Sequence, residues 1–113
     1  MEIVKDSDRF DSLQIRLLAE ITRDVMNGLI ELGIPSEKLQ EGTENLVFGI
    51  AAIVDGSRVM ELDGQPVNPV LTFAADDDKQ QLIDAGGSWM HEYAMSTVEE
   101  IVQEHLNAND GNA

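Results

Sequence analysis

The residues best suited to chemistry in this sequence stand together in one segment, GGSWMHEY, at residues 86–93. The segment holds the single Trp, the single Tyr and one of the two histidines of the chain. An imidazole changes charge near neutral pH and can therefore act as a general acid or base. A catalytic or small-molecule site here would use His91 as the titrating group and Trp89 and Tyr93 as walls. Ser88 and the glycine amides before it would bind an anion at the start of a helix.

The same four residues, Ser88, Trp89, His91 and Tyr93, are also a candidate interface. Trp89 and Tyr93 are four residues apart and would stack on the polar side of a helix, where they anchor a partner or pack beneath a hairpin. His91 and His105 fall within the apolar face of that helix, which favours burial with one hydrogen bond. Their separation of about 21 Å along a helix that rises about 1.5 Å per residue excludes a metal ion shared within one chain.

Established catalytic motifs do not occur in the sequence. There is no G-x-S-x-G and no phosphate-binding or dinucleotide-binding glycine motif. His91 and Glu92 begin the zinc motif H-E-x-x-H, but Met95 stands where the second histidine is needed. Asp76, Asp77 and Asp78 lack the spacing of a calcium loop, and the absence of cysteine removes thiol chemistry. We therefore expect no catalytic residue, no cofactor and no metal.

The charge of the chain indicates the class of partner. There are 22 acidic and 7 basic residues, which give a formal net charge of -15, and residues 76–113 hold nine acids and one base. Few side chains here can neutralise phosphates, so we expect no direct nucleic-acid binding. A basic protein would suit an acidic face made of Asp76, Asp77, Asp78, Glu99, Glu100 and Glu104. The alternative is that the acidity serves solubility or adaptation to salt.

One basic stripe interrupts this acidic surface. Arg9, Arg16 and Arg23 are spaced by seven and so line one flank of the first predicted helix. They either pair with the surrounding acids or bind an acidic group of a partner.

Two helices are predicted in the first half of the chain. Apolar residues recur every three or four positions over 8–32, with N-caps at Asp6–Asp8 and a stop at Gly33. This helix is apolar on two sides, so it lies centrally or meets another subunit. Residues 36–55 are ambiguous between helix and strand where 46–54 is wholly apolar. Length favours a helix, with a candidate break at Gly42 and Thr43.

A hairpin is predicted to follow the helices. Residues 57–62 form its first strand, and Asp63-Gly64 is a strong turn signal. Pro66 and Pro69 cannot donate to a ladder, so we expect proper pairing only from Val70 onward.

The last third of the chain is predicted to be mainly helical. Residues 79–85 fit either a strand or a helical turn, and a final helix runs from the Ser88 cap to about Leu106. Its broad apolar face comprises Met90, Ala94, Met95, Val98, Ile101, Val102 and Leu106. Residues 107–113 are expected to form a disordered tail.

These elements predict an α+β fold: a small single domain over 1–106, in the order ααββα, with the helices packed on the β-hairpin. A lone two-stranded hairpin is marginal, so it must lie on the helices or pair with another hairpin across a dimer. With the two-sided first helix, this predicts a homodimer. The charged N-terminus and the short apolar run 46–54 predict a cytoplasmic protein without a membrane partner.

We interpret the chain as a small acidic soluble protein with a non-enzymatic interaction or regulatory role. The alternative is a small-molecule-binding or catalytic domain that uses Ser88–Tyr93.

Overall fold

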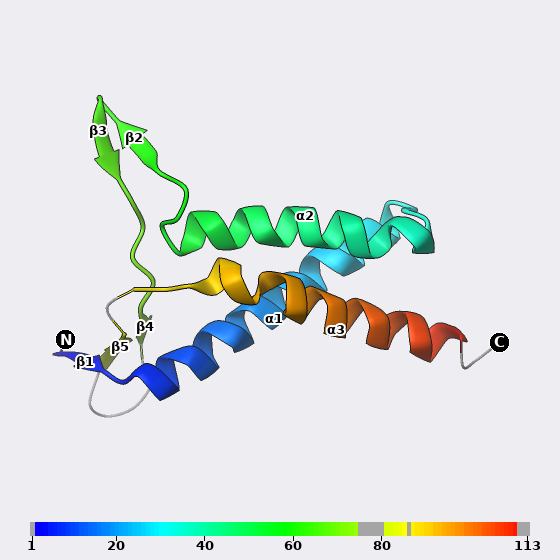
Figure 1. The fold of residues 1–113 in the computed structure, drawn as a ribbon, viewed down its shortest axis with the longest axis horizontal. Helices are drawn as coiled ribbons and strands as arrows, with labels where there is room; N and C mark the ends of the chain where they lie inside the picture. The colour runs from blue at the N-terminus through cyan, green and yellow to red at the C-terminus, as the bar shows by residue number, and fades with distance from the viewer. Residues whose placement is uncertain (1, 75–80, 86, 111–113) are drawn as a thin grey trace.

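The computed structural model describes residues 2–74, 81–85 and 87–110. Over these residues it is a small α+β domain with three helices and two small sheets (Figure 1), and the predicted fold class is confirmed. The helices are α1 (Ser7–Glu31), α2 (Ser36–Val54) and α3 (Met90–Asp110). None of them combines the length and apolar character needed to cross a bilayer.

Helix α1 begins and ends where the sequence predicts, within one residue. The Asp6 side chain accepts a hydrogen bond from the Arg9 N–H at 3.1 Å, which caps the first turn. Gly33 has a φ of +84°, and the Ile34 N–H returns to the Leu29 carbonyl at 3.1 Å. The chain leaves the helix through a left-handed residue, which glycine adopts at little cost.

Helix α2 is continuous, so the helical interpretation of residues 46–54 is correct and the candidate break is not used. Thr43 is fully buried, and its hydroxyl donates to the Leu39 carbonyl one turn earlier at 2.7 Å instead of capping a new helix. A Cβ at Gly42 would lie 3.3 Å from Leu29, so the glycine allows α1 and α2 to approach closely.

A three-stranded sheet joins distant parts of the chain. Strand β5 (Gln81–Asp84) pairs in parallel with β1 (Glu2–Lys5) and antiparallel with β4 (Phe73–Ala74). The structure thereby resolves the ambiguous segment 79–85 as a strand over 81–84 and adds β1, which the sequence analysis did not predict. Ile83 of β5 is 1% exposed, and the sheet holds the start of α1 through the Asp6 N–H bond to the Asp84 carbonyl.

The predicted hairpin is present, but it pairs earlier than expected. Strands β2 (Met60–Leu62) and β3 (Gln65–Val67) join through Asp63 at φ +52° and Gly64 at φ +77°, the signs of a type I′ turn. The expectation of pairing only from Val70 is wrong. Pro66 lies opposite Glu61, at a position of a two-residue hairpin that exchanges no ladder hydrogen bond, so its missing N–H costs nothing.

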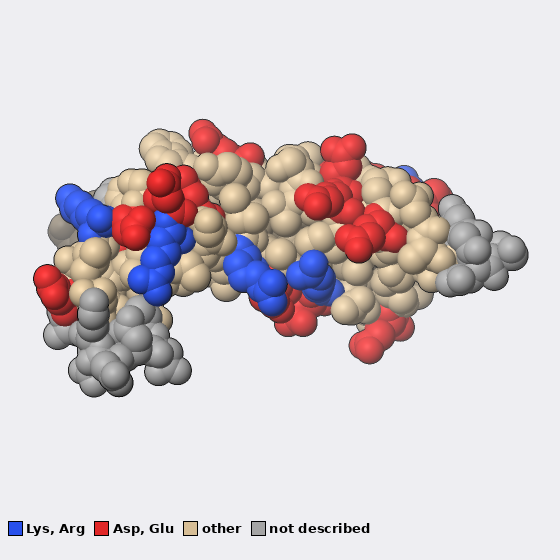
Figure 2. Space-filling view, turned by 90° about the horizontal axis from the view of Figure 1, so that it is seen from below, with Lys and Arg blue, Asp and Glu red and all other residues tan. Residues whose placement is uncertain are grey.

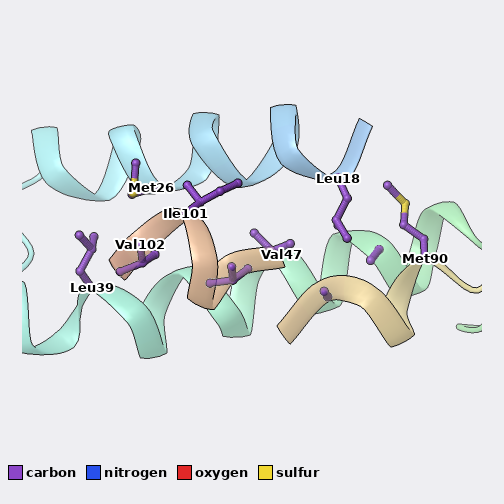
Figure 3. Close-up of a cluster of buried hydrophobic side chains, with 10 residues drawn as sticks. Leu18, Met26, Leu39, Val47, Met90, Ile101 and Val102 are labelled. Atoms are coloured by element: carbon purple, nitrogen blue, oxygen red, sulfur yellow. The ribbon is translucent and has the colours of Figure 1, made fainter. Parts of the chain in front are cut away.

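The core lies between the three helices (Figure 3). Helix α3 buries most of its predicted apolar face, with Met95 as the exception at 49% exposure. The hairpin buries none of its six residues and projects from the body beyond the end of α2 (Figure 1). The helices therefore bury their apolar faces mainly against one another, which differs in detail from the expected packing on the hairpin.

Helix α3 extends further than the sequence indicates. It runs through Asn107 to Asp110, into the segment predicted as a disordered tail, and residues 111–113 lie outside the described part of the chain.

Candidate functional site

The most organised polar group in the structure joins the end of α2 to the start of α3. Asp55 follows the last residue of α2, and one of its carboxylate oxygens, Oδ2, lies 2.5 Å from His91 Nδ1 and 3.0 Å from the His91 backbone N. The other oxygen accepts the Ser57 backbone N–H at 2.9 Å. We call Asp55, Ser57 and His91 the His91 cluster.

Asp55 is the buried centre of this cluster. Its side chain has no exposed surface, while that of His91 is 22% exposed. Burial alone would raise the pKa of Asp55, but hydrogen bonds from the Ser57 side chain and from the backbone and ring of His91 outweigh this and lower that pKa. The carboxylate is therefore ionised at neutral pH, and it faces the positive end of the α3 dipole.

The cluster contains Ser, His and Asp, but their order differs from that of a hydrolase triad. In a triad, the serine contacts the imidazole nitrogen that the aspartate does not. Here the Ser57 hydroxyl lies 3.0 Å from Nδ1, the same nitrogen that Asp55 contacts. Ser57 thus supports the carboxylate and is not placed as a nucleophile, and no hydrogen bond to His91 Nε2 occurs among the described residues.

Two rings flank His91 at the surface. The ring of Phe48 lies 6.0 Å from the imidazole in an edge arrangement, and that of Trp89 lies at 6.2 Å. Trp89 is 61% exposed, Phe48 is 44% exposed, and Met95 is exposed one turn further along α3. We call Phe48 and Trp89, the two exposed rings that contact His91, the Trp89 surface.

The predicted stacking of Trp89 on Tyr93 is wrong. Trp89 precedes the first residue of α3, so the four-residue spacing of a helix does not apply to it. Tyr93 is half-buried and packs against the core instead.

Ser88 has a structural role. Its hydroxyl accepts the Met90 N–H at 3.3 Å and donates to the buried Gln14 side chain at 2.9 Å. Ser88 is itself 9% exposed, so its hydroxyl caps α3 and ties it to α1. Of the four candidate residues, only Trp89 and His91 therefore contact each other at the surface.

The charged candidates lie on the outer sides of the helices. Glu99, Glu100 and Glu104 are exposed on α3, whereas Asp76, Asp77 and Asp78 lie outside the described residues. Arg9, Arg16 and Arg23 are exposed on α1, and Arg16 pairs with Glu20 at 3.2 Å. Figure 2 shows acidic and basic side chains interspersed on one face of the molecule.

Two surface hollows lie away from the His91 cluster. One, of about 270 Å³, lies between α1 and α3 and includes Arg23 and His105. The other, of about 300 Å³, lies between α1 and α2 and includes Lys38 and Glu41. Neither provides the cleft beside Ser88–Tyr93 that a small-molecule site at His91 would use.

Neither a metal-binding group nor a similar protein indicates a function for the chain. Within residues 2–74, 81–85 and 87–110, no three His, Asp or Glu side chains are grouped to bind a metal ion. Comparison with family models, with curated proteins and with solved structures finds no match to the chain.

Sequence reasoning missed Asp55, Ser57 and Phe48. One signal for Asp55 was available in the sequence. The C-terminal end of a helix carries a partial negative charge, which favours a positively charged side chain there and disfavours a carboxylate such as that of Asp55. An acid in that position indicates that another element compensates its charge, and here that element is the start of α3.

Proposed function

We propose that this chain is a non-enzymatic interaction protein that binds a partner protein through the Trp89 surface. The observation that carries this proposal is the 61% exposure of Trp89, whose ring contacts the same imidazole as a second exposed ring, Phe48. Tryptophan is the residue most enriched among those that dominate binding energy at interfaces. The large apolar area that it leaves in water here would be removed from water by a partner.

The His91 cluster supports this surface by making it rigid. Because Asp55 holds both the ring and the backbone of His91, the imidazole against which Phe48 and Trp89 lie is fixed in place. A fixed surface loses less conformational entropy when it binds than a mobile one does.

The charge supports a basic partner. Glu92 is exposed in the first turn of α3 beside Trp89, and the chain as a whole carries -15. Arginine and lysine side chains would pair with the carboxylates and lie against the indole face. Such binding weakens as salt screens the charges.

Affinity capture from native lysate at low and high salt tests this function. The immobilised wild-type chain should retain a basic protein that Trp89→Ala retains at least about tenfold less well. Ile15→Ala is the matched control, because it removes an exposed aliphatic side chain of α1 outside the Trp89 surface. Equal retention by Trp89→Ala and wild type would refute the proposal.

The homodimer and the cytoplasmic location predicted from the sequence belong to the same proposal. In this proposal the chain acts as a homodimer in the cytoplasm. The absence of cysteine fits a reducing compartment, in which proteins are not stabilised by disulfides. Cell fractionation of the tagged chain tests the location.

A second candidate function, acid–base or ligand-binding chemistry at His91, is favoured by the Asp55–His91 contact. A carboxylate on Nδ1 leaves Nε2 as the nitrogen that would accept a substrate proton. Hydrolysis of an activated ester such as p-nitrophenyl acetate tests it. Wild type should exceed both buffer and His91→Ala by about tenfold or more. Equal rates for the two proteins would exclude acid–base catalysis by His91.

A further inference from the structure

The hollow between α1 and α3 combines an apolar floor with charged and polar side chains around it. Its volume is about 270 Å³. Met26 of α1 and Ile101 of α3 line it; they are 6% and 8% exposed and belong to the hydrophobic core (Figure 3). The polar side chains of its lining are Arg23, Asn27, Glu104 and His105. We call this site the α1–α3 hollow. Binding sites for small molecules have this composition, with an apolar lining and a few polar groups.

Two regular helices hold these side chains in place. Arg23 and Asn27 are four residues apart on α1, and Ile101, Glu104 and Ala108 recur every three or four residues on α3. Each set therefore shares one face of its helix. Sites built on packed helices keep their geometry better than sites built on loops, so the hollow is formed before a ligand arrives.

The two charged side chains of the hollow are not used by the fold. Within the described part of the chain, neither Arg23 nor Glu104 makes an ion pair or a side-chain hydrogen bond. Arg16 lies seven residues before Arg23 on the same flank of α1, and it pairs with Glu20. In a chain with 22 acidic residues, Arg23 thus keeps all of its N–H donors for another acceptor.

The charges of the hollow indicate a zwitterion. The Asn109 side-chain nitrogen lies 3.0 Å from His105 Nε2; because an amide nitrogen only donates, Nε2 accepts and the imidazole is uncharged. The lining then holds one cation, Arg23, and one anion, Glu104, from opposite helices. A phosphate dianion would meet the carboxylate, and a polyamine would meet the guanidinium. A molecule with one charge of each sign pairs with both.

The volume limits the size of that molecule. A water molecule takes up about 30 Å³ of the liquid, so the hollow holds about nine waters or a ligand of about nine non-hydrogen atoms. We infer that the α1–α3 hollow binds a free α-amino acid with an apolar side chain, such as leucine. Its carboxylate pairs with Arg23, its ammonium pairs with Glu104, and its side chain lies on Met26 and Ile101. This inference does not depend on the Trp89 surface, none of whose residues lines the hollow.

An NMR chemical-shift titration of the wild-type chain with L-leucine tests the inference. The amide signals of the lining residues should shift and saturate with a Kd of about 0.1–1 mM, which a ligand of this size can reach. Two truncated probes separate the charges: 4-methylpentanoate lacks the ammonium of leucine, and 3-methylbutylamine lacks its carboxylate. Each should bind at least about tenfold more weakly than leucine, because each loses one charge-assisted contact.

Matched variants assign each charge to its residue. Arg23→Gln should weaken leucine at least about tenfold and should bind 3-methylbutylamine no more weakly than wild type does. Glu104→Gln should also weaken leucine but should bind 4-methylpentanoate no more weakly. Arg16→Gln and Glu99→Gln are the controls, since both residues are exposed on the same helices outside the hollow, and leucine binding should not change. All four side chains are exposed, so circular dichroism should stay that of wild type.

Three results would overturn the inference. The first is the absence of saturable shifts in the wild-type chain at ~10 mM L-leucine. The second is binding of 4-methylpentanoate as tight as that of leucine, which would make the ligand a simple anion. The third is equal leucine binding by wild type, Arg23→Gln and Glu104→Gln. Ala108→Phe gives a separate check, because a ring at this lining position fills the hollow without changing a charge and should abolish leucine binding; unchanged binding would also refute the site.

Discussion

Replacing Asp55 by alanine should be the most destabilising single change among the charged residues of the described chain. The substitution removes the acceptor of the Ser57 N–H, the His91 N–H and His91 Nδ1. A hydrogen bond to a charged group contributes about 1.5–3 kcal/mol to stability, and such contributions within one network are not additive. Water can reach the half-buried imidazole once the carboxylate is gone, so the expected loss in the free energy of unfolding is about 3 kcal/mol.

That loss is a large fraction of the total free energy of unfolding. A chain of this length has a free energy of unfolding of roughly 6–17 kcal/mol. Urea unfolding at about pH 7, followed by circular dichroism, measures the change from the midpoint. Asp55→Asn keeps one acceptor oxygen and should lose about half as much. Asp24→Ala, an exposed aspartate of α1, is the control and should change the free energy of unfolding by less than ~0.5 kcal/mol.

The pH dependence gives an independent check of the same reasoning. The pKa of Asp55 is lower in the folded than in the unfolded chain, where an aspartate titrates near 3.9. Its contribution to stability is therefore fully present well above that value and is lost as the pH falls through the folded pKa. The stability gap between wild type and Asp55→Asn should narrow below about pH 4. An Asp55→Ala loss under ~1 kcal/mol, or a gap that does not narrow in acid, would refute the hydrogen-bond network of Asp55, Ser57 and His91.

Two further predictions concern the backbone and the buried polar pair. Gly56→Ala should cost clearly more than Gly64→Ala in urea unfolding, because both have positive φ but only at Gly56 would a Cβ meet the Pro69 carbonyl oxygen, at 2.9 Å; equal costs would contradict the clash. Ser88→Ala should lower the free energy of unfolding by about 1–3 kcal/mol by leaving the buried Gln14 oxygen unpaired. Adding Gln14→Leu should recover part of that loss, and strictly additive losses in the double-mutant cycle would show that the two side chains do not interact.

The local signals in the sequence predicted the helices well. Capping residues and glycines mark the ends of α1, and the Asp63-Gly64 turn fixes the hairpin, because these depend only on neighbouring residues. The buried face of α1 was harder to predict. It runs through Phe10 and Leu18 but also through Gln14 and Thr22, which are polar. Thr22 satisfies its hydroxyl within the helix, by donating to the Leu18 carbonyl at 2.7 Å.

Contacts between distant segments account for what the sequence did not reveal. Gln14 is buried because Ser88, 74 residues away, bonds to it, and β1 exists because β5 returns beside it. The same holds at the candidate site, where Asp55 and His91 are 36 residues apart. The periodicity of apolar residues does not reveal such contacts, because they form only when the helices pack against one another.

The net charge affects the two proposed interactions, the binding of a basic partner and the homodimer, in opposite ways. Their dependence on salt therefore distinguishes one from the other. A basic partner at the Trp89 surface gains from attraction, so salt weakens its binding. Two copies of a chain that carries -15 repel each other, so salt should strengthen the proposed homodimer. One salt titration that follows both the mass of the chain and its capture of a basic protein should therefore show opposite slopes. If both associations weaken with salt, charge pairing between copies holds the dimer together.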